Sequence, residues 1–124
     1  MQATKVKIDP AGDPIWIDIR FKGLAVASYE YQLFHGSNNH VLQHFKGNNQ
    51  NPEDDFYYLP VPVSSNINRL IDVRSNFVGL DPANYKEFET RVEIYQGKQK
   101  IGEVNEKGEL SGLTQFSQLF IIIE

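Results

Sequence analysis

Hydrophobic and polar residues alternate with a period of two along much of the chain, which predicts β-strands. In residues 15–21 (IWIDIRF) every second residue is isoleucine or phenylalanine, and the residues between them are tryptophan, aspartate and arginine. Residues 86–95 (KEFETRVEIY) alternate in the same way. A helix would scatter these apolar side chains around its circumference, so both segments are expected to be strands with one buried face. Further strands are expected at 25–35, 40–46, 56–63, 69–78 and 117–124, with weaker candidates at 4–8 and 99–104.

Segments rich in Gly, Pro, Asn and Asp separate these strands and recur about every ten to fifteen residues. This rhythm predicts an all-β fold: an antiparallel β-sandwich of two sheets with about 8–9 strands, in a single domain over residues 1–124. The pattern leaves an immunoglobulin-like, a C2-like and a jelly-roll topology open. Pro60 and Pro62 cannot donate ladder hydrogen bonds, so the strand 56–63 is expected at a sheet edge.

Consecutive loops of an antiparallel sandwich fall at alternate ends. One end is then expected to gather the polar loops 9–14, 36–39, 64–68 and 96–98. The opposite end is expected to gather the acidic loops 22–24, 47–55, 79–86 and 105–112.

Composition narrows the function classes. The net charge of -4 and the lack of a Lys/Arg cluster argue against nucleic-acid partners and anionic membranes. The 124 residues contain no cysteine, which removes disulfides, thiol catalysis and thiolate metal sites. No apolar run approaches a membrane span, and residues 1–10 lack the layout of a signal peptide. We therefore expect a cytoplasmic protein, although a secreted domain whose leader had been removed would have the same sequence.

The three histidines, His35, His40 and His44, lie within ten residues of each other. Strand geometry places His40 and His44 about 13 Å apart, too far to share one metal ion. His35 and His40 flank the segment GSNN and could face each other across a hairpin. They form a weak candidate metal pair, and the favoured interpretation is a polar pair beside a turn.

The acidic end invites a calcium hypothesis, because Ca²⁺ prefers several oxygen ligands and neighbouring loops can bring carboxylates together. Asp54, Asp55 and Asp81 are the candidate ligands. No EF-hand spacing occurs, so no cofactor is expected apart from this Ca²⁺ hypothesis.

Support for catalysis is thin, since none of the familiar nucleophile, phosphate-loop or zinc motifs occurs. Ser37 lies near His35 and His40, with Asp9 or Asp13 to orient them, and Asp54 with Glu109 could form a carboxylate pair. A small hydrolase is therefore the third hypothesis, and the protein is not expected to be an enzyme.

Surface aromatics carry the main functional hypothesis. If the isoleucines of 15–21 face the core, Trp16 faces outward, and the same reasoning applies to Tyr95 and to one of Tyr57 and Tyr58. Exposed aromatic residues are enriched at interfaces. We expect an interaction module that binds another protein or its own copies, with Trp16, Tyr57 and Tyr95 as anchors and Asn38 and Asn39 in the polar loops. Calcium or carbohydrate binding at one end is the alternative.

The apolar run 119–123 adds to this expectation. The segment 117–124 is expected to be a strand buried on both faces, because an uncovered apolar edge would promote aggregation. It is expected either inside a sheet or paired with another chain.

Overall fold

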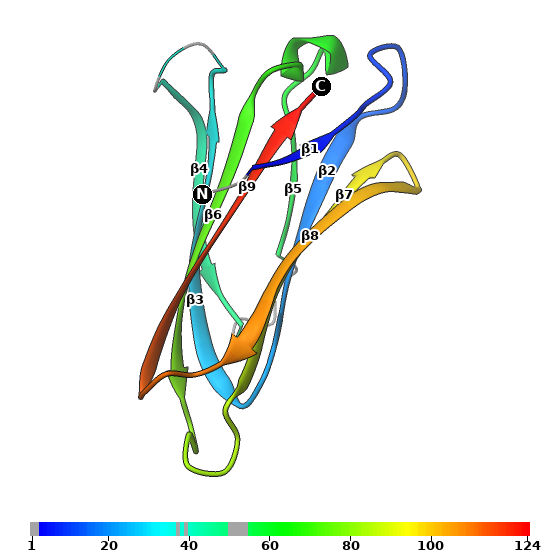
Figure 1. Ribbon diagram of the computed structural model, residues 1–124. Coiled ribbons are helices and arrows are strands. Elements are labelled where there is room, and N and C mark those ends of the chain that lie inside the picture. Colours follow the sequence, from blue (N-terminus) through cyan, green and yellow to red (C-terminus); the bar gives the residue numbers. More distant parts are fainter. Residues whose placement is uncertain (1–2, 37, 39, 50–54) are drawn as a thin grey trace.

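Two β-sheets pack face to face in the computed structural model, which describes residues 3–36, 38, 40–49 and 55–124 (Figure 1). The first sheet has five strands in the order β1 (Thr4–Val6), β9 (Thr114–Ile123), β6 (Leu70–Gly79), β3 (Ala25–Phe34) and β4 (Val41–Asn48). The second has four strands in the order β5 (Phe56–Tyr58), β2 (Ile15–Lys22), β7 (Glu87–Gln96) and β8 (Gln99–Glu109). A short 3-10 helix, η1 (Val63–Asn66), lies between β5 and β6.

The predicted all-β sandwich is confirmed, with one strand pair that departs from the antiparallel arrangement. β1 runs parallel to β9, with Thr4 opposite Ile121 and Val6 opposite Ile123. In the described part of the chain, the hairpins β3–β4 and β7–β8 join neighbours in one sheet, and the other connections between β2 and β9 pass from one sheet to the other. Loop 9–14 and η1 therefore lie at one end of the molecule, and loops 23–24 and 80–86 lie at the other (Figure 1).

The strand expected at 56–63 is shorter than predicted, because regular pairing covers only Phe56–Tyr58. Its expected place at a sheet edge is confirmed. β8 continues to Glu109, well beyond the predicted end at 104, and β9 begins at Thr114 rather than at 117. Among the described residues, no helix is both long enough and apolar enough to cross a membrane.

β9 lies between β1 and β6, so the first of the two alternatives for the apolar run 119–123 is correct. The expectation that this strand is buried on both faces is wrong. Leu119, Ile121 and Ile123 are buried, whereas Phe120 and Ile122 on the opposite face are partly exposed. The alternation was hidden in the sequence because both faces of this strand carry apolar residues.

The core between the sheets has two parts. Among the described residues, the main core contains sixteen buried residues, and the small core contains five: Ala25, Ala27, Phe77, Phe88 and Leu110. On β6, Ser75 lies between main-core Val73 and small-core Phe77, and on β7, Thr90 lies between Phe88 and Val92. Ser117 is the cross-strand partner of Ser75. The hydroxyls of Ser75, Thr90 and Ser117 are buried and have no hydrogen-bond partner among the described residues. We call these three residues the hydroxyl layer.

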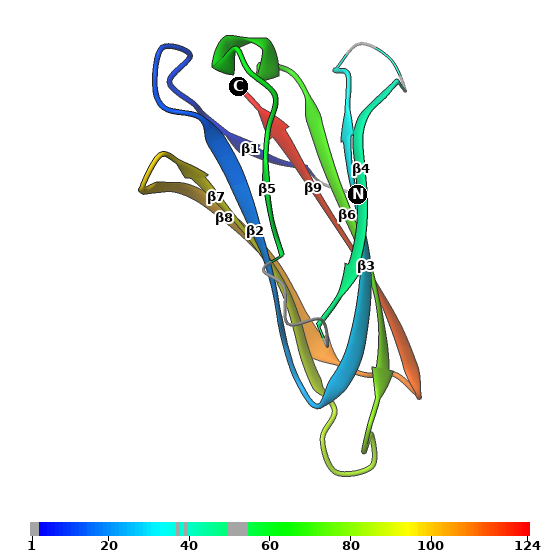
Figure 2. The ribbon, with the colours of Figure 1, turned by 180° about the vertical axis from the view of Figure 1, so that it is seen from behind.

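The edge strands β4 and β5 belong to different sheets and lie along one open side of the sandwich (Figure 2). Side chains connect the two strands there. The ring of Phe45 stacks on Tyr57 with a centroid distance of 4.7 Å. Gln43 accepts a hydrogen bond from the hydroxyl of Tyr31 and donates one to the carbonyl of Tyr58. These contacts fix β5, which positions the residues described next.

Candidate binding face of the four-stranded sheet

The outer face of the four-stranded sheet carries a row of aromatic residues from three adjacent strands. In the strand register, Trp16 of β2 is opposite Tyr58 of β5 on one side and Tyr95 of β7 on the other. Phe56 is two residues from Tyr58 and points to the same face, since side chains alternate along a strand. We call Trp16, Phe56, Tyr58 and Tyr95 the aromatic row.

Trp16 is held in a single orientation within this row. Its ring stacks on Tyr95 with a centroid distance of 4.2 Å and an interplanar angle of 9°. Its indole Nε1 donates a hydrogen bond of 2.8 Å to the carbonyl oxygen of Gly97. On the other side the ring of Phe56 lies 6.0 Å away, edge to face. Phe56 and Tyr58 remain 43% and 57% exposed, so the row presents an open aromatic surface around a fixed Trp16.

A groove runs beside the indole of Trp16, between β2 and β5. Its lining combines aromatic with charged side chains: Trp16, Asp18, Arg20, Asp55, Phe56 and Tyr58. Within this lining the Arg20 Nε donates to the Asp18 Oδ2 at 2.9 Å, so a paired cation and anion lie next to the rings. Apolar walls with a few oriented polar groups are typical of ligand-binding grooves.

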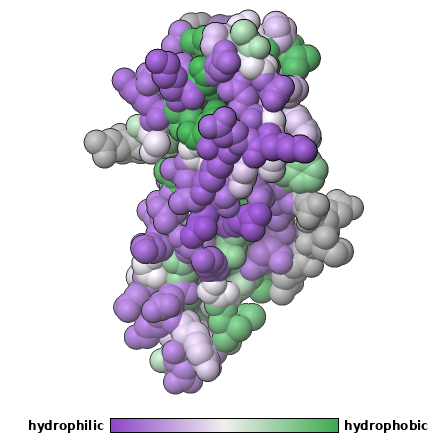
Figure 3. Space-filling model, turned by 90° about the vertical axis from the view of Figure 1, so that its right-hand side faces the viewer, coloured by the Kyte–Doolittle hydropathy of each residue, from purple (hydrophilic) through white to green (hydrophobic). Residues whose placement is uncertain are grey.

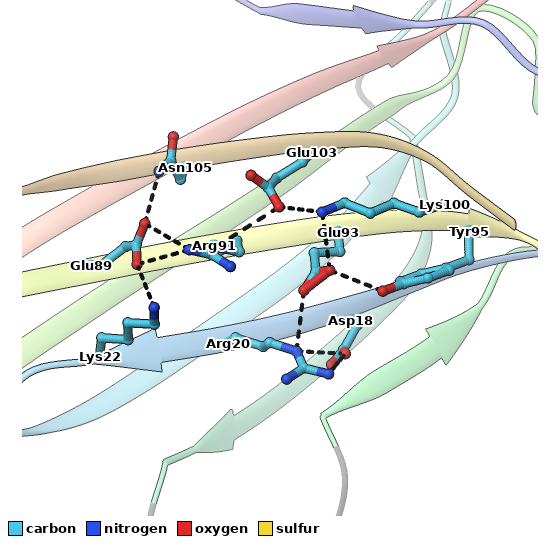
Figure 4. Close-up of polar contacts among 10 residues, drawn as sticks. All are labelled: Asp18, Arg20, Lys22, Glu89, Arg91, Glu93, Tyr95, Lys100, Glu103 and Asn105. Atoms are coloured by element: carbon cyan, nitrogen blue, oxygen red, sulfur yellow. Dashed lines mark hydrogen bonds and ion pairs between the residues drawn. The ribbon is translucent and has the colours of Figure 1, made fainter.

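Beyond the aromatic row, charged residues cover the middle of the same face in a continuous network (Figure 4). The network, which we call the ion-pair ladder, comprises Asp18, Arg20, Lys22, Glu89, Arg91, Glu93, Lys100 and Glu103, with Tyr95 and Asn105 as uncharged members. It contains four cationic and four anionic side chains, so its own charges balance. In space-filling view this side of the molecule is mostly hydrophilic (Figure 3).

Of the three directly opposite charged pairs that β2 and β7 contribute to the ladder, Lys22 and Glu89 carry opposite signs and the other two carry like signs. Arg20 faces Arg91, and Asp18 faces Glu93 across β2 and β7. Like charges in such positions destabilise a sheet. Here ion pairs to diagonal neighbours and to residues of the same strand offset the repulsion between the like charges. One of them joins Arg20 Nε to a Glu93 carboxylate oxygen at 3.3 Å. The side chain of Glu93 is only 9% exposed as a result of this packing.

The ladder lowers the pKa of its two buried carboxylates. A hydrogen bond from Asn105 is the main cause that lowers the pKa of Glu89, and Arg91 adds to it. For Glu93, burial acts to raise the pKa, but hydrogen bonds from Tyr95 and Lys100 outweigh it, so the pKa lies below its ordinary value. Both side chains are therefore held in their charged form.

Two of the predicted aromatic anchors face outward as expected, Trp16 and Tyr95, but Tyr57 does not. Its ring stacks on Tyr31 and Phe45, packs against the main core, and its hydroxyl bonds to that of Tyr29. Tyr58 takes the outward position instead. The sequence left this choice open because residues 56–58 are all aromatic, and the register with β2 decides it.

The predicted polar residues Asn38 and Asn39 belong to the connection between β3 and β4. Asn38 is exposed, and its side-chain oxygen accepts a hydrogen bond from the backbone amide of His40. Asn38 therefore supports the turn locally. Asn39 lies outside the described residues.

The expected pairing of His35 and His40 across the turn is present in the backbone, because the amide of His35 donates to the carbonyl of His40 at 2.9 Å. His44 lies on β4 and bonds through Nε2 to Glu30 at 2.8 Å. Residues 3–36, 38, 40–49 and 55–124 contain no group of three or more His, Asp or Glu side chains arranged to hold a metal ion.

The candidate calcium ligands do not form a common site among the described residues either. Asp55 accepts a hydrogen bond from the hydroxyl of Tyr29 at 2.7 Å, beside β5. Asp81 lies in the β6–β7 loop, where its carbonyl accepts the amide of Tyr85 and its carboxylate accepts the amide group of Asn84. Asp54, and Ser37 of the hydrolase hypothesis, lie outside the described residues.

The ion-pair ladder was not predicted from the sequence. A signal exists, because the outward positions of β2 and β7 are charged almost without interruption. The pairing itself joins residues far apart in the chain, such as Lys22 with Glu89, and requires the strand order.

Comparison with known proteins gives no further guide. No protein-family model, no curated protein and no solved structure matches this chain.

Proposed function

We propose that this protein is a non-enzymatic binding module that docks another protein on the outer face of its four-stranded sheet. The observation that carries this proposal is the aromatic row, in which Trp16 is fixed by stacking and by its hydrogen bond to Gly97. Binding energy in protein interfaces concentrates in a few tryptophan, tyrosine and arginine side chains at well-packed positions. A side chain that is already immobile loses little conformational entropy when a partner covers it.

The ion-pair ladder supports the same face as the contact surface. Its charges are balanced and satisfy each other, so it does not select a strongly charged partner such as a nucleic acid. The ladder instead borders the aromatic row on one side with fixed polar groups. Aromatic side chains bordered by polar groups are common in protein-binding surfaces.

The test of this proposal removes the exposed rings and measures partner binding. A double variant, Phe56→Ser with Tyr58→Ser, should capture fewer proteins from a lysate of the source cells than the wild-type chain. Each protein that the wild type captures and the variant does not should, once purified, bind the variant at least about tenfold more weakly than the wild type. Trp16 is the sole tryptophan of the chain, so its fluorescence emission should change when the partner binds the wild type.

The matched control is Val41→Ser with Ile67→Ser, which removes two exposed apolar residues outside this face. It should bind the same partners as the wild type with unchanged affinity. The proposal is wrong if both double variants capture the wild-type set of partners, or if a captured partner leaves the emission of Trp16 unchanged.

Carbohydrate binding is the second candidate, and the groove beside Trp16 favours it. Sugar rings stack on aromatic faces, and the Asp18–Arg20 pair in the lining of the groove offers both acceptors and donors to hydroxyl groups. Binding to immobilised glycans that disappears in the Phe56→Ser, Tyr58→Ser variant would select this candidate over a protein partner. A chain that binds no glycan would exclude it.

A further inference from the structure

A second surface of this protein lies at the end of the sandwich formed by the β2–β3, β6–β7 and β8–β9 connections. Twelve large hydrophobic side chains are exposed among the described residues, and six of them gather here. They are Leu24, Val78, Leu80, Tyr85, Leu113 and Phe116, which we call the apolar end. Large exposed apolar patches on soluble proteins mark sites of association.

Backbone contacts hold the connections of the apolar end together. The amide of Leu80 donates to the carbonyl of Leu24 at 3.1 Å, and the amide of Gly79 donates to the carbonyl of Leu113 at 2.9 Å. Val78 is opposite Thr114 on β9, two residues before Phe116. These pairings bring the three connections to the same end of the sandwich, where Leu80 and Leu113 are among the most exposed side chains at 59% and 62%.

The core beneath the apolar end is small. It consists of five residues, two of which are alanines, whereas the main core contains sixteen. More large apolar side chains are exposed at this end than are buried beneath it. Burying these side chains against another surface would remove apolar area from water, which favours association.

The charges around the apolar end indicate what kind of surface it fits. Glu87 and Glu109 are directly opposite each other on β7 and β8, so they repel, and they border the hollows that contain Leu24 and Tyr85. Neither has an ion pair among the described residues, and the nearby Lys86 and Lys107 have none either. In the ion-pair ladder, by contrast, every charged member has a partner.

We propose that a second copy of this chain docks on the apolar end and forms a two-fold symmetric dimer. A two-fold interface brings the same surface together from both copies. It therefore supplies both signs of charge at once, so that Lys86 and Lys107 of one copy meet Glu87 and Glu109 of the other while the apolar side chains cover each other. A partner with charge of a single sign would satisfy only one of the two sets.

The dimer uses a different surface from the aromatic row, so the two proposals succeed or fail separately. Sedimentation equilibrium of the wild-type chain should give a mass that rises with concentration to twice 14.2 kDa. The emission of Trp16 should stay constant over the same concentration range, because the aromatic row is not part of this interface.

Removing apolar side chains gives the first decisive comparison. Leu80→Ser with Leu113→Ser should raise the dimer dissociation constant at least about tenfold, whereas Phe56→Ser with Tyr58→Ser should leave it unchanged. Circular dichroism and thermal melting of each variant would establish that it is folded. A wild-type chain that remains monomeric overturns the proposal, and so does a folded Leu80→Ser, Leu113→Ser variant that dimerises as well as the wild type.

Charge reversal gives the second comparison. A chain with Glu87→Lys and Glu109→Lys should not dimerise with itself, and neither should a chain with Lys86→Glu and Lys107→Glu. A mixture of the two should form a heterodimer, because each then supplies the charges that the other lacks. Failure of the mixture to associate would overturn the complementarity on which a second copy was chosen.

Discussion

The aromatic row and the apolar end both expose large side chains, but the structure supports them in different ways. The aromatic row lies on regular strands, and its rings pack on each other beside a network of paired charges. The apolar end lies largely on connections between strands, and its flanking charges have no partners among the described residues. The first is a preorganised surface, and the second is one that association would complete.

The cores beneath the two surfaces also differ, since the core beneath the apolar end is the smaller one. The main core contains sixteen buried residues, and the small core contains five, with the hydroxyl layer between them. Local stability within a protein follows the density of buried apolar contacts. We therefore expect the two ends of the sandwich to open at different free energies, and the following changes test this comparison.

Phe77→Ala should have the largest effect. Phe77 is fully buried and packs against Phe88 and Phe21, so its loss removes much of the small core. The expected cost is about 3–5 kcal/mol of unfolding free energy, measured by urea denaturation. Hydrogen exchange should show that amides at the β2–β3 turn and the end of β6 lose protection first. If Phe77→Ala lowered the protection of all strands equally, the two cores would be a single cooperative unit.

Tyr95→Phe tests the ion-pair ladder and should have a smaller effect. It removes the 2.9 Å hydrogen bond from the tyrosine hydroxyl to Glu93, at a cost of about 1.5 kcal/mol at neutral pH. Tyr58→Phe is the matched control, because the Tyr58 hydroxyl makes no such bond to a buried carboxylate of the described residues. Urea denaturation at pH 7 should show a lower free energy of unfolding for Tyr95→Phe than for Tyr58→Phe.

The same variant should change the response to acid. The pKa of Glu93 is lower in the folded protein than in the unfolded chain, where it is about 4.3. The resulting stabilisation is complete above that value and is lost as the pH falls through the folded pKa. In Tyr95→Phe the folded pKa of Glu93 should rise towards its ordinary value, so stability should fall less between about pH 6 and pH 3. An unchanged acid profile would contradict this role of Tyr95.

Thr90→Val should have the smallest effect and the opposite sign. The hydroxyl of Thr90 is buried without a hydrogen-bond partner among the described residues, and valine keeps the shape of the side chain. Replacing an unsatisfied buried hydroxyl with a methyl group should stabilise the protein by about 0.5–1 kcal/mol. Thermal melting of the variant would measure this gain, and a loss of stability would show that the hydroxyl layer is hydrated or bonded.

The sequence predicted the strands best where one face alone is apolar. The alternation in 15–21 locates β2 to within one residue, since the residues that point to the core are isoleucine or phenylalanine and those that point outward are mostly charged. β8 was predicted five residues too short, because residues 105–109 at a sheet edge are exposed and contain no large apolar side chain. A strand with no buried face at its end leaves no periodic signal.

The candidate surfaces were harder to predict than the strands. The outward direction of Trp16 and Tyr95 follows from alternation, whereas the choice of Tyr58 over Tyr57 required the register with β2. The apolar end gave no signal, because Leu24, Leu80 and Leu113 occur singly in separate loops that the sequence showed only as acidic and polar. Proximity in space, rather than residue type, defines that surface.

The parallel pairing of β1 with β9 has a consequence for synthesis. Thr4 is opposite Ile121, so β1 has no sheet partner among the described residues until residues 114–123 have left the ribosome. β6 likewise lacks one of its two neighbours until β9 arrives. Contacts between residues so distant in sequence slow folding, since a long loop must close before they form. The five-stranded sheet is therefore completed only when β9 inserts between β1 and β6.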